Sequence, residues 1–165
     1  MSYTVSDLSA YLRGEWAVER TMLDRTSGER GTFSGTVTFT GSARTANDDD
    51  GALLQHEEGT VRWGAHAGPA TRSYVWRPGP SPESMDVFFP DGRFFHSVQL
   101  GELSAQDASG LAGPGSRAEH WCDPDTYRVA YTPVGPDELR YAWDVTGPAK
   151  NLLLTTTLRR QIRRV

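Results

Sequence analysis

The chain has 165 residues, of which 17 are basic and 21 are acidic, so that its net charge is −4. Its 17 glycines and 10 prolines favour many turns over long helices and argue against a helical bundle. No run of about 18 apolar residues is present, so we expect neither a transmembrane helix nor a membrane partner. The acidic balance also argues against nucleic acid as the main partner.

The first predicted element is a short N-terminal helix. Ser6 or Asp7 can cap it, and Leu8, Tyr11 and Leu12 fall on one helical face. The rest of the chain alternates apolar and polar residues between turn signals. This pattern predicts ten strands, over residues 14–23, 31–40, 52–63, 71–77, 84–89, 93–100, 117–122, 126–131, 138–146 and 150–159.

The connections between these strands read as short turns and polar loops. Pro90-Asp91-Gly92 is a tight hairpin signal. Gly/Pro-rich or polar stretches at 41–51, 65–70, 101–116 and 132–137 are expected to be loops or turns. About ten closely spaced strands with short connections predict an all-β fold, a single antiparallel up-and-down barrel. No linker separates two domains, so we expect one barrel domain over residues 1–165.

The opening of the chain lacks the basic start and apolar core of a secretory signal. Cys122 is the single cysteine, so no internal disulfide can form, and we expect it to be a buried small apolar residue. Both features favour a reducing, cytoplasmic location.

Gly14-Glu15-Trp16 begins the first strand directly after the short helix. This arrangement resembles the Gly-x-Trp signature of the lipocalin-like (calycin) superfamily. The resemblance implies that Trp16 plugs the closed end of the barrel and that a basic residue of the last strand, Arg159 or Arg160, packs across it. A guanidinium over an indole adds a contact of about 0.5–2 kcal/mol.

The end of the chain carries a second resemblance. A Trp-Asp-Val-x-Gly-Pro-x-Lys pattern at Trp143–Lys150 and a Thr-x-x-Arg-Arg pattern at Thr156–Arg160 are similar to an uncharacterised bacterial and fungal domain family of the lipocalin-like type. That resemblance implies no particular activity.

The alternation of each strand predicts which side chains face the lumen. If Trp16 faces inward, so does Arg20, which then needs a carboxylate, a tyrosine or an anionic ligand as its partner. The other predicted lumen residues are aromatic or histidine, and they are Tyr74, Trp76, His96, His120, Tyr127, Tyr131, Tyr141 and Trp143. Aromatic walls with a few polar groups are typical of a small-molecule site, whereas the same residues can simply fill a core.

His96 and His120 are the candidate acid–base residues, because histidine titrates near neutral pH. We expect His120 to reach the cavity and to hydrogen-bond Tyr127 or Tyr131 across the turn at 123–125. The preferred interpretation is a barrel that binds a small apolar or aromatic molecule. The alternative is a cofactor-independent cyclase, isomerase or hydrolase that uses His120, His96 and Tyr127. A strongly shifted buried histidine beside the cavity would favour the enzyme.

A third possibility is a filled barrel that acts through its surface, and a homodimer is possible in each case. No cofactor is expected, because no nucleotide or phosphate motif is present. No metal site is expected either, because His120 and Cys122 have no further ligand nearby in the sequence. The acidic run 48–50 lacks the spacing of a calcium loop and reads as a solvated loop.

Overall fold

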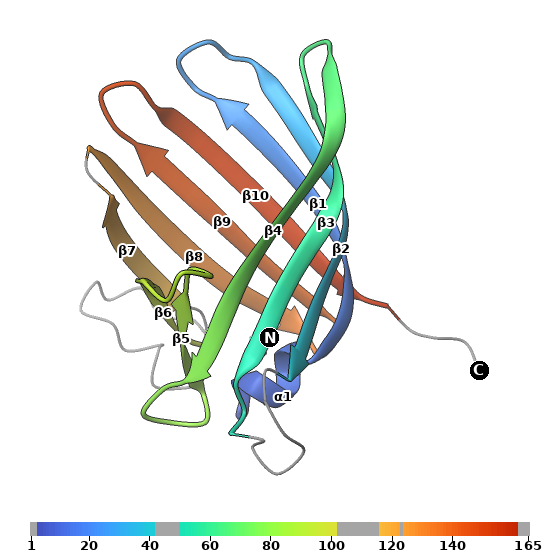
Figure 1. Ribbon diagram of the computed structural model, residues 1–165, viewed down its shortest axis with the longest axis vertical. Helices are drawn as coiled ribbons and strands as arrows, with labels where there is room; N and C mark the ends of the chain where they lie inside the picture. Colours follow the sequence, from blue (N-terminus) through green and yellow to red (C-terminus); the bar gives the residue numbers. More distant parts are fainter. Residues whose placement is uncertain (1–2, 42–49, 102–115, 123, 162–165) are drawn as a thin grey trace.

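The computed structural model describes residues 3–41, 50–101, 116–122 and 124–161 (Figure 1). It consists of one short helix, α1 (Leu8–Leu12), and ten strands. The strands are β1 (Gly14–Asp24), β2 (Arg30–Gly41), β3 (Leu53–Trp63), β4 (His66–Pro78), β5 (Ser84–Phe88), β6 (Phe94–Gln99), β7 (Ser116–Cys122), β8 (Asp125–Gly135), β9 (Glu138–Thr146) and β10 (Asn151–Arg160). Asp7 caps α1 by accepting a hydrogen bond from Ala10 N.

All ten strands belong to one antiparallel sheet with the order β6-β5-β4-β3-β2-β1-β10-β9-β8-β7. Every strand pairs with the next strand in the chain except β6, which does not pair with β7, and β1 also pairs with β10. The sheet curls until its edge strands β6 and β7 meet through side chains, where the rings of Phe95 and His120 are 5.1 Å apart. The predicted all-β, up-and-down barrel of about ten strands with a short N-terminal helix is therefore confirmed.

Two predicted loops are wrong, because the strands continue through them. β4 begins at His66 and includes Pro69, although the stretch 65–70 was expected to be a loop. Proline is tolerated there because β5 pairs only with Val75–Pro78 of β4, which leaves the first part of β4 at a sheet edge. β8 continues to Gly135 through Pro133, with an irregularity in its pairing with β9 between these two residues.

The hairpin turns β1–β2, β3–β4, β7–β8 and β9–β10 lie at one end of the barrel, and α1 lies at the other (Figure 1). Trp16 is completely buried at the helix end, and its Nε1 donates to Leu12 O at 2.8 Å. The Arg160 guanidinium covers the indole at 4.1 Å from the ring centroid and donates to Tyr11 O at 2.7 Å. Arg159 points away and pairs with Glu138 at 3.1 Å.

Gly14 makes this closure possible. Its φ of +123° is strained for any residue with a side chain, and a Cβ there would lie 3.4 Å from the guanidinium of Arg160. The chain therefore turns from α1 into β1 directly beneath Trp16.

The barrel is packed at the helix end and open at the hairpin end. Inward side chains near α1, among them Leu53, Leu139 and Leu158, are fully buried. Val145 near the hairpin turns is buried too, but five other inward apolar side chains there remain half-buried, and these are Met22, Val61, Ala70, Leu152 and Leu154. We call this second group the apolar mouth.

Cys122 is exposed, so the expectation that it is buried is wrong. It ends β7, next to the turn at the open end of the barrel. None of the described helical segments is long and apolar enough to cross a membrane. Most of the predicted loops at 41–51 and 101–116, including Asp48 and Asp49, lies outside the described residues.

Candidate functional site

A buried arginine–glutamate pair lies inside the barrel, between the packed end and the apolar mouth. Arg20 of β1 and Glu57 of β3 are 5% and 2% exposed. Arg20 donates two parallel hydrogen bonds to the carboxylate, at 2.7 and 2.8 Å. Its Nε donates to Thr156 Oγ1 at 2.8 Å, and Nη2, one of the two amino groups that bind Glu57, also donates to Tyr141 Oη at 3.2 Å. Arg20 thus meets both a carboxylate and a tyrosine.

Glycine in β2 allows this pair to form across an intervening strand. Arg20 lies opposite Phe33 and Glu57 lies opposite Val37, so that Gly35 is the inward residue between them. Gly35 also faces Gly59 of β3, and a Cβ on Gly35 would collide with the backbone of Glu58. The two strands approach each other closely at this glycine pair, and no side chain separates the guanidinium from the carboxylate.

Arg72 of β4 adds a second positive charge to the same group. It lies directly opposite Glu57, and its Nε is 3.2 Å from Glu57 Oε1. That nitrogen makes no hydrogen bond within the described part of the chain, so its approach to Glu57 is an ion pair. Its side chain is 37% exposed and lies over the Tyr74 ring at 5.7 Å. Arg20, Glu57 and Arg72 together carry one net positive charge.

The pairing favours the charged forms of Arg20 and Glu57. Burial alone would raise the pKa of Glu57, but the hydrogen bonds of Arg20 and the charges of both arginines hold it below its ordinary value of 4.5. Burial likewise opposes the charge of Arg20, and Glu57 outweighs that effect, so the pKa of Arg20 is raised. The excess positive charge is therefore permanent at neutral pH.

Aromatic side chains form the wall beside this charged group. Phe95 stacks on Trp143 at 5.0 Å and on Phe89 at 4.5 Å, with nearly parallel ring planes. Phe95 and Trp143 border a small cavity of about 20 Å³. Its lining residues come from β3, β4, β5, β6, β8 and β9, and they are Gln55, Arg72, Tyr74, Trp76, Val87, Phe95, His96, Tyr131, Tyr141 and Trp143. Such a volume holds about one water molecule, so side chains fill the rest of this region.

His96 is the buried histidine of this cavity. It is 3% exposed, and its Nε2 lies 3.2 Å from Tyr131 Oη. Burial, with a smaller contribution from His120, lowers the pKa of His96 to about 3. The ring is therefore neutral at physiological pH. Burial also raises the pKa of Tyr131 well above 10, so that its hydroxyl keeps the proton.

The structure places the other predicted catalytic residues differently from expectation. The rings of His120 and Tyr127 face each other at 6.5 Å between centroids, and His96 rather than His120 makes the hydrogen bond to a tyrosine. Tyr127 is half-buried near the open end, where Lys150 Nζ lies 3.5 Å from its hydroxyl. Within the described segments, no three potential metal-ligating side chains come together around His120 or elsewhere.

Sequence reasoning overlooked Glu57, Gln55 and Arg72 as site residues. Glu57 shares the inward face of β3 with Leu53 and Gln55. Gln55 accepts a hydrogen bond from Trp76 Nε1 at 2.7 Å. The alternation of residues 53, 55 and 57 along the strand is the signal that could have found them.

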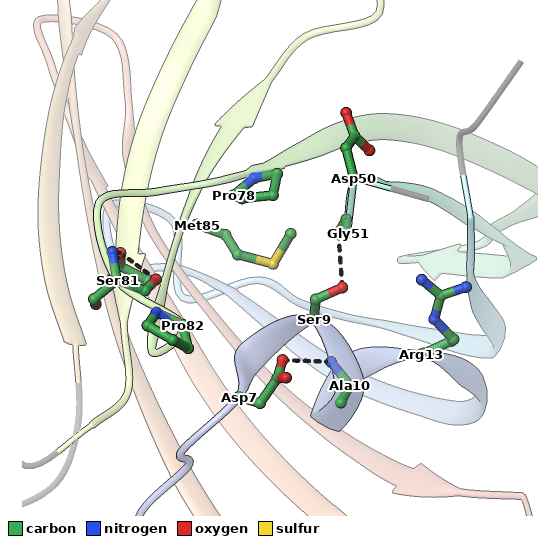
Figure 2. Close-up of a pocket in the computed structure, with 11 residues that line it drawn as sticks. Asp7, Ser9, Ala10, Arg13, Asp50, Gly51, Pro78, Ser81, Pro82 and Met85 are labelled. Carbon is green, nitrogen blue, oxygen red and sulfur yellow. Dashed lines mark hydrogen bonds between the residues drawn. The ribbon is translucent and has the colours of Figure 1, made fainter. Parts of the chain in front are cut away.

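A larger hollow of about 610 Å³ lies beside α1, outside the barrel (Figure 2). Its polar groups are used locally, since Asp7 caps the helix and Ser9 Oγ donates to Gly51 O at 2.7 Å. Ser81 and Ser84 bond each other on its far side. The inward-facing charges and the apolar mouth therefore define the better candidate site.

Fold and site together define a ten-stranded meander barrel with a sealed floor and a charged interior. Residues 12–160 match a family of unknown function (DUF6314), and the chain belongs to that family. No curated protein matches the sequence.

Two solved structures show the same fold. The S-type phycobiliprotein lyase CPES from Guillardia theta is 11% identical, with a TM-score of 0.68 over 98% of this chain and 95% of the lyase. A protein of unknown function from the DUF3598 family of Nostoc punctiforme is 14% identical, with a TM-score of 0.58. That match covers 93% of this chain and 49% of the Nostoc protein.

Proposed function

We propose that this barrel binds a small apolar or aromatic molecule that carries an anionic group, in its open half. One observation carries the proposal, namely the half-exposed Arg72 guanidinium beneath the apolar mouth. Glu57 is already matched by Arg20 through two hydrogen bonds, so Arg72 is the unmatched charge. A carboxylate can pair with it bidentately.

The apolar mouth supplies the surface for the rest of the molecule. Met22, Val61, Leu152 and Leu154 point inward but remain half-buried, which is unfavourable unless something covers them. The Phe89–Phe95–Trp143 stack on the opposite wall suits an aromatic body. Because the cavity beneath is only about 20 Å³, the body of the ligand belongs in the mouth and not in the packed half.

His96 is a strongly shifted buried histidine beside the cavity, the feature expected to favour the enzyme, but the downward direction of its pKa shift supports a binding protein instead. A general base works best with a pKa near the operating pH. Burial lowers the pKa of His96 to about 3, which makes the ring a weak base. His120 and Tyr127 form a ring contact, without the hydrogen bond that a proton relay needs.

We also propose a superfamily, a cellular location and partners for the chain. Gly14, Trp16 and Arg160 support membership of the lipocalin-like (calycin) superfamily, because the arginine seals the floor across the tryptophan. We place the protein in a bacterial cytoplasm, with a small molecule as its partner and without nucleic acid or membrane. Each chain carries a whole site, so a homodimer would carry two independent ones.

The experiment is a titration of the full chain with 1-naphthoate, benzoate and octanoate, followed by intrinsic tryptophan fluorescence. We expect saturable binding of at least one acid, because Trp143 lies on the wall of the site. Arg72→Gln should weaken that binding at least tenfold, which is about 1.4 kcal/mol, and the uncharged naphthalene should show no such dependence.

Arg62→Gln is the matched control. Arg62 lies on the exposed, outward face of β3, and its replacement removes the same charge from the protein. Equal losses of affinity in both variants would show that Arg72→Gln acts only through the net charge of the protein. The absence of any saturable change with the three acids at millimolar concentration would overturn the proposal.

A further inference from the structure

The unused nitrogen of His96 is a buried polar atom without a partner. Nε2 is occupied by Tyr131, whereas Nδ1 makes no hydrogen bond within the described part of the chain. An unsatisfied buried polar atom costs about 1–3 kcal/mol, so such an atom in a native interior needs an explanation. His96 shares the wall of the cavity with Arg72, the residue that reaches the open half.

The cavity offers room for one more polar atom, and for little else. Its volume of about 20 Å³ accommodates a single water-sized group. Gln55, Tyr131 and Tyr141 add further polar groups to its wall. It is too small for an aromatic ring, so a ligand in the mouth can insert only a substituent into it.

The hydrogen-bond chemistry selects the kind of substituent. Tyr131 either donates to Nε2, which leaves Nδ1–H as a donor, or accepts from Nε2–H, which leaves Nδ1 as an acceptor. A hydroxyl group both donates and accepts, so it satisfies His96 in either tautomer. A methyl group of the same size satisfies neither.

From this geometry we infer that His96 is a specificity-determining residue, whose Nδ1 hydrogen-bonds a hydroxyl group on the buried end of the ligand. The ligand class is then a hydroxylated aromatic acid, with its carboxylate at Arg72 and its hydroxyl in the small cavity. This inference rests on the proposed function, because it needs the ring of the ligand to lie in the mouth.

The test compares matched pairs of probes on the wild-type chain. The 2-, 3- and 4-hydroxybenzoates are titrated beside the methylbenzoates with the substituent at the same position. We expect at least one hydroxy acid to bind about tenfold tighter than its methyl partner. His96→Leu should abolish this preference and leave the affinity for the methyl compound within about twofold. His56→Leu, on the outward face of β3 with a side chain that is 44% exposed, should retain the preference.

A spectroscopic measurement tests the His96 contact without relying on the His96→Leu variant. In protein labelled with ¹⁵N-histidine, the Nδ1 resonance of His96 should move on addition of the preferred hydroxy acid and stay in place with its methyl partner. Equal affinity within every pair, with an unmoved resonance, would overturn the inference and leave the proposed function intact. Failure of all six acids to bind would overturn the inference, and it would overturn the proposed function too if 1-naphthoate, benzoate and octanoate also fail to bind.

Discussion

The two halves of this barrel use the same alternation of residues for opposite purposes. On β10, Leu158 and Leu154 both face inward, yet Leu158 is fully buried near α1 and Leu154 is half-buried in the apolar mouth. The helix and the Arg160–Trp16 contact seal one end, whereas only hairpin turns border the other. Stability can therefore reside in the sealed half, which leaves the open half free to expose apolar surface to a ligand.

The sharpest test of this division is the same substitution on the same strand in each half. Leu158→Ala should lower the free energy of unfolding by about 3–4 kcal/mol, because it leaves a cavity in a packed core. Leu154→Ala should lower it by about 1 kcal/mol, because the lost side chain was partly in water. Urea denaturation of both variants measures the difference. Equal losses would show that the open half is as tightly packed as the sealed one.

The second prediction concerns the boundary between the halves. Glu57→Gln removes the negative charge that holds Arg20 and Arg72, and it should destabilise the protein by about 3 kcal/mol at pH 7. The adjacent Glu58 faces solvent, so Glu58→Gln should change stability by less than about 0.5 kcal/mol. Comparable effects of the two substitutions would contradict the central role of the buried pair.

The pH dependence follows from the same pair. The pKa of Glu57 is lowered on folding, so its contribution to stability is present above about pH 4.5 and is lost as the pH falls below that value. Unfolding measured between pH 5 and pH 3 should therefore show a steeper loss in the wild type than in Glu57→Gln.

The sequence predicted the architecture better than the site, for a physical reason. Alternation in a strand specifies which side a residue faces, and this placed Trp16, Arg20, Tyr141 and Trp143 inside the barrel. Alternation does not specify how far the wall closes over a residue. Glu57 is buried against Arg20 across the side-chain-free position of Gly35, and this contact joins residues far apart in the chain.

The choice between the two histidines shows the same limit. His96 and His120 both alternate with apolar or aromatic residues, and nothing local distinguishes them. The difference arises where β6 meets β7, because His96 packs against Trp143 and Tyr131 in the interior while His120 stays half-buried at the seam. Non-neighbouring strands set that depth, and their register could not be read from a single strand.

A second pH-dependent slope in stability belongs to His96 alone. Its pKa falls from 6.5 in the unfolded chain to about 3 in the folded protein, so the unfolded state binds the extra proton first. The contribution of His96 to the free energy of unfolding is complete above pH 6.5. It declines by up to about 1.4 kcal/mol for each pH unit that the pH falls below that value. Between pH 6.5 and 5 the decline precedes the titration of Glu57, and thermal unfolding in that interval isolates it. His96→Leu should flatten the curve there, whereas replacement of the exposed His66 should not. An unchanged slope in His96→Leu would mean that the imidazole is solvated, and that the sealed half extends less far into the barrel than its packing indicates.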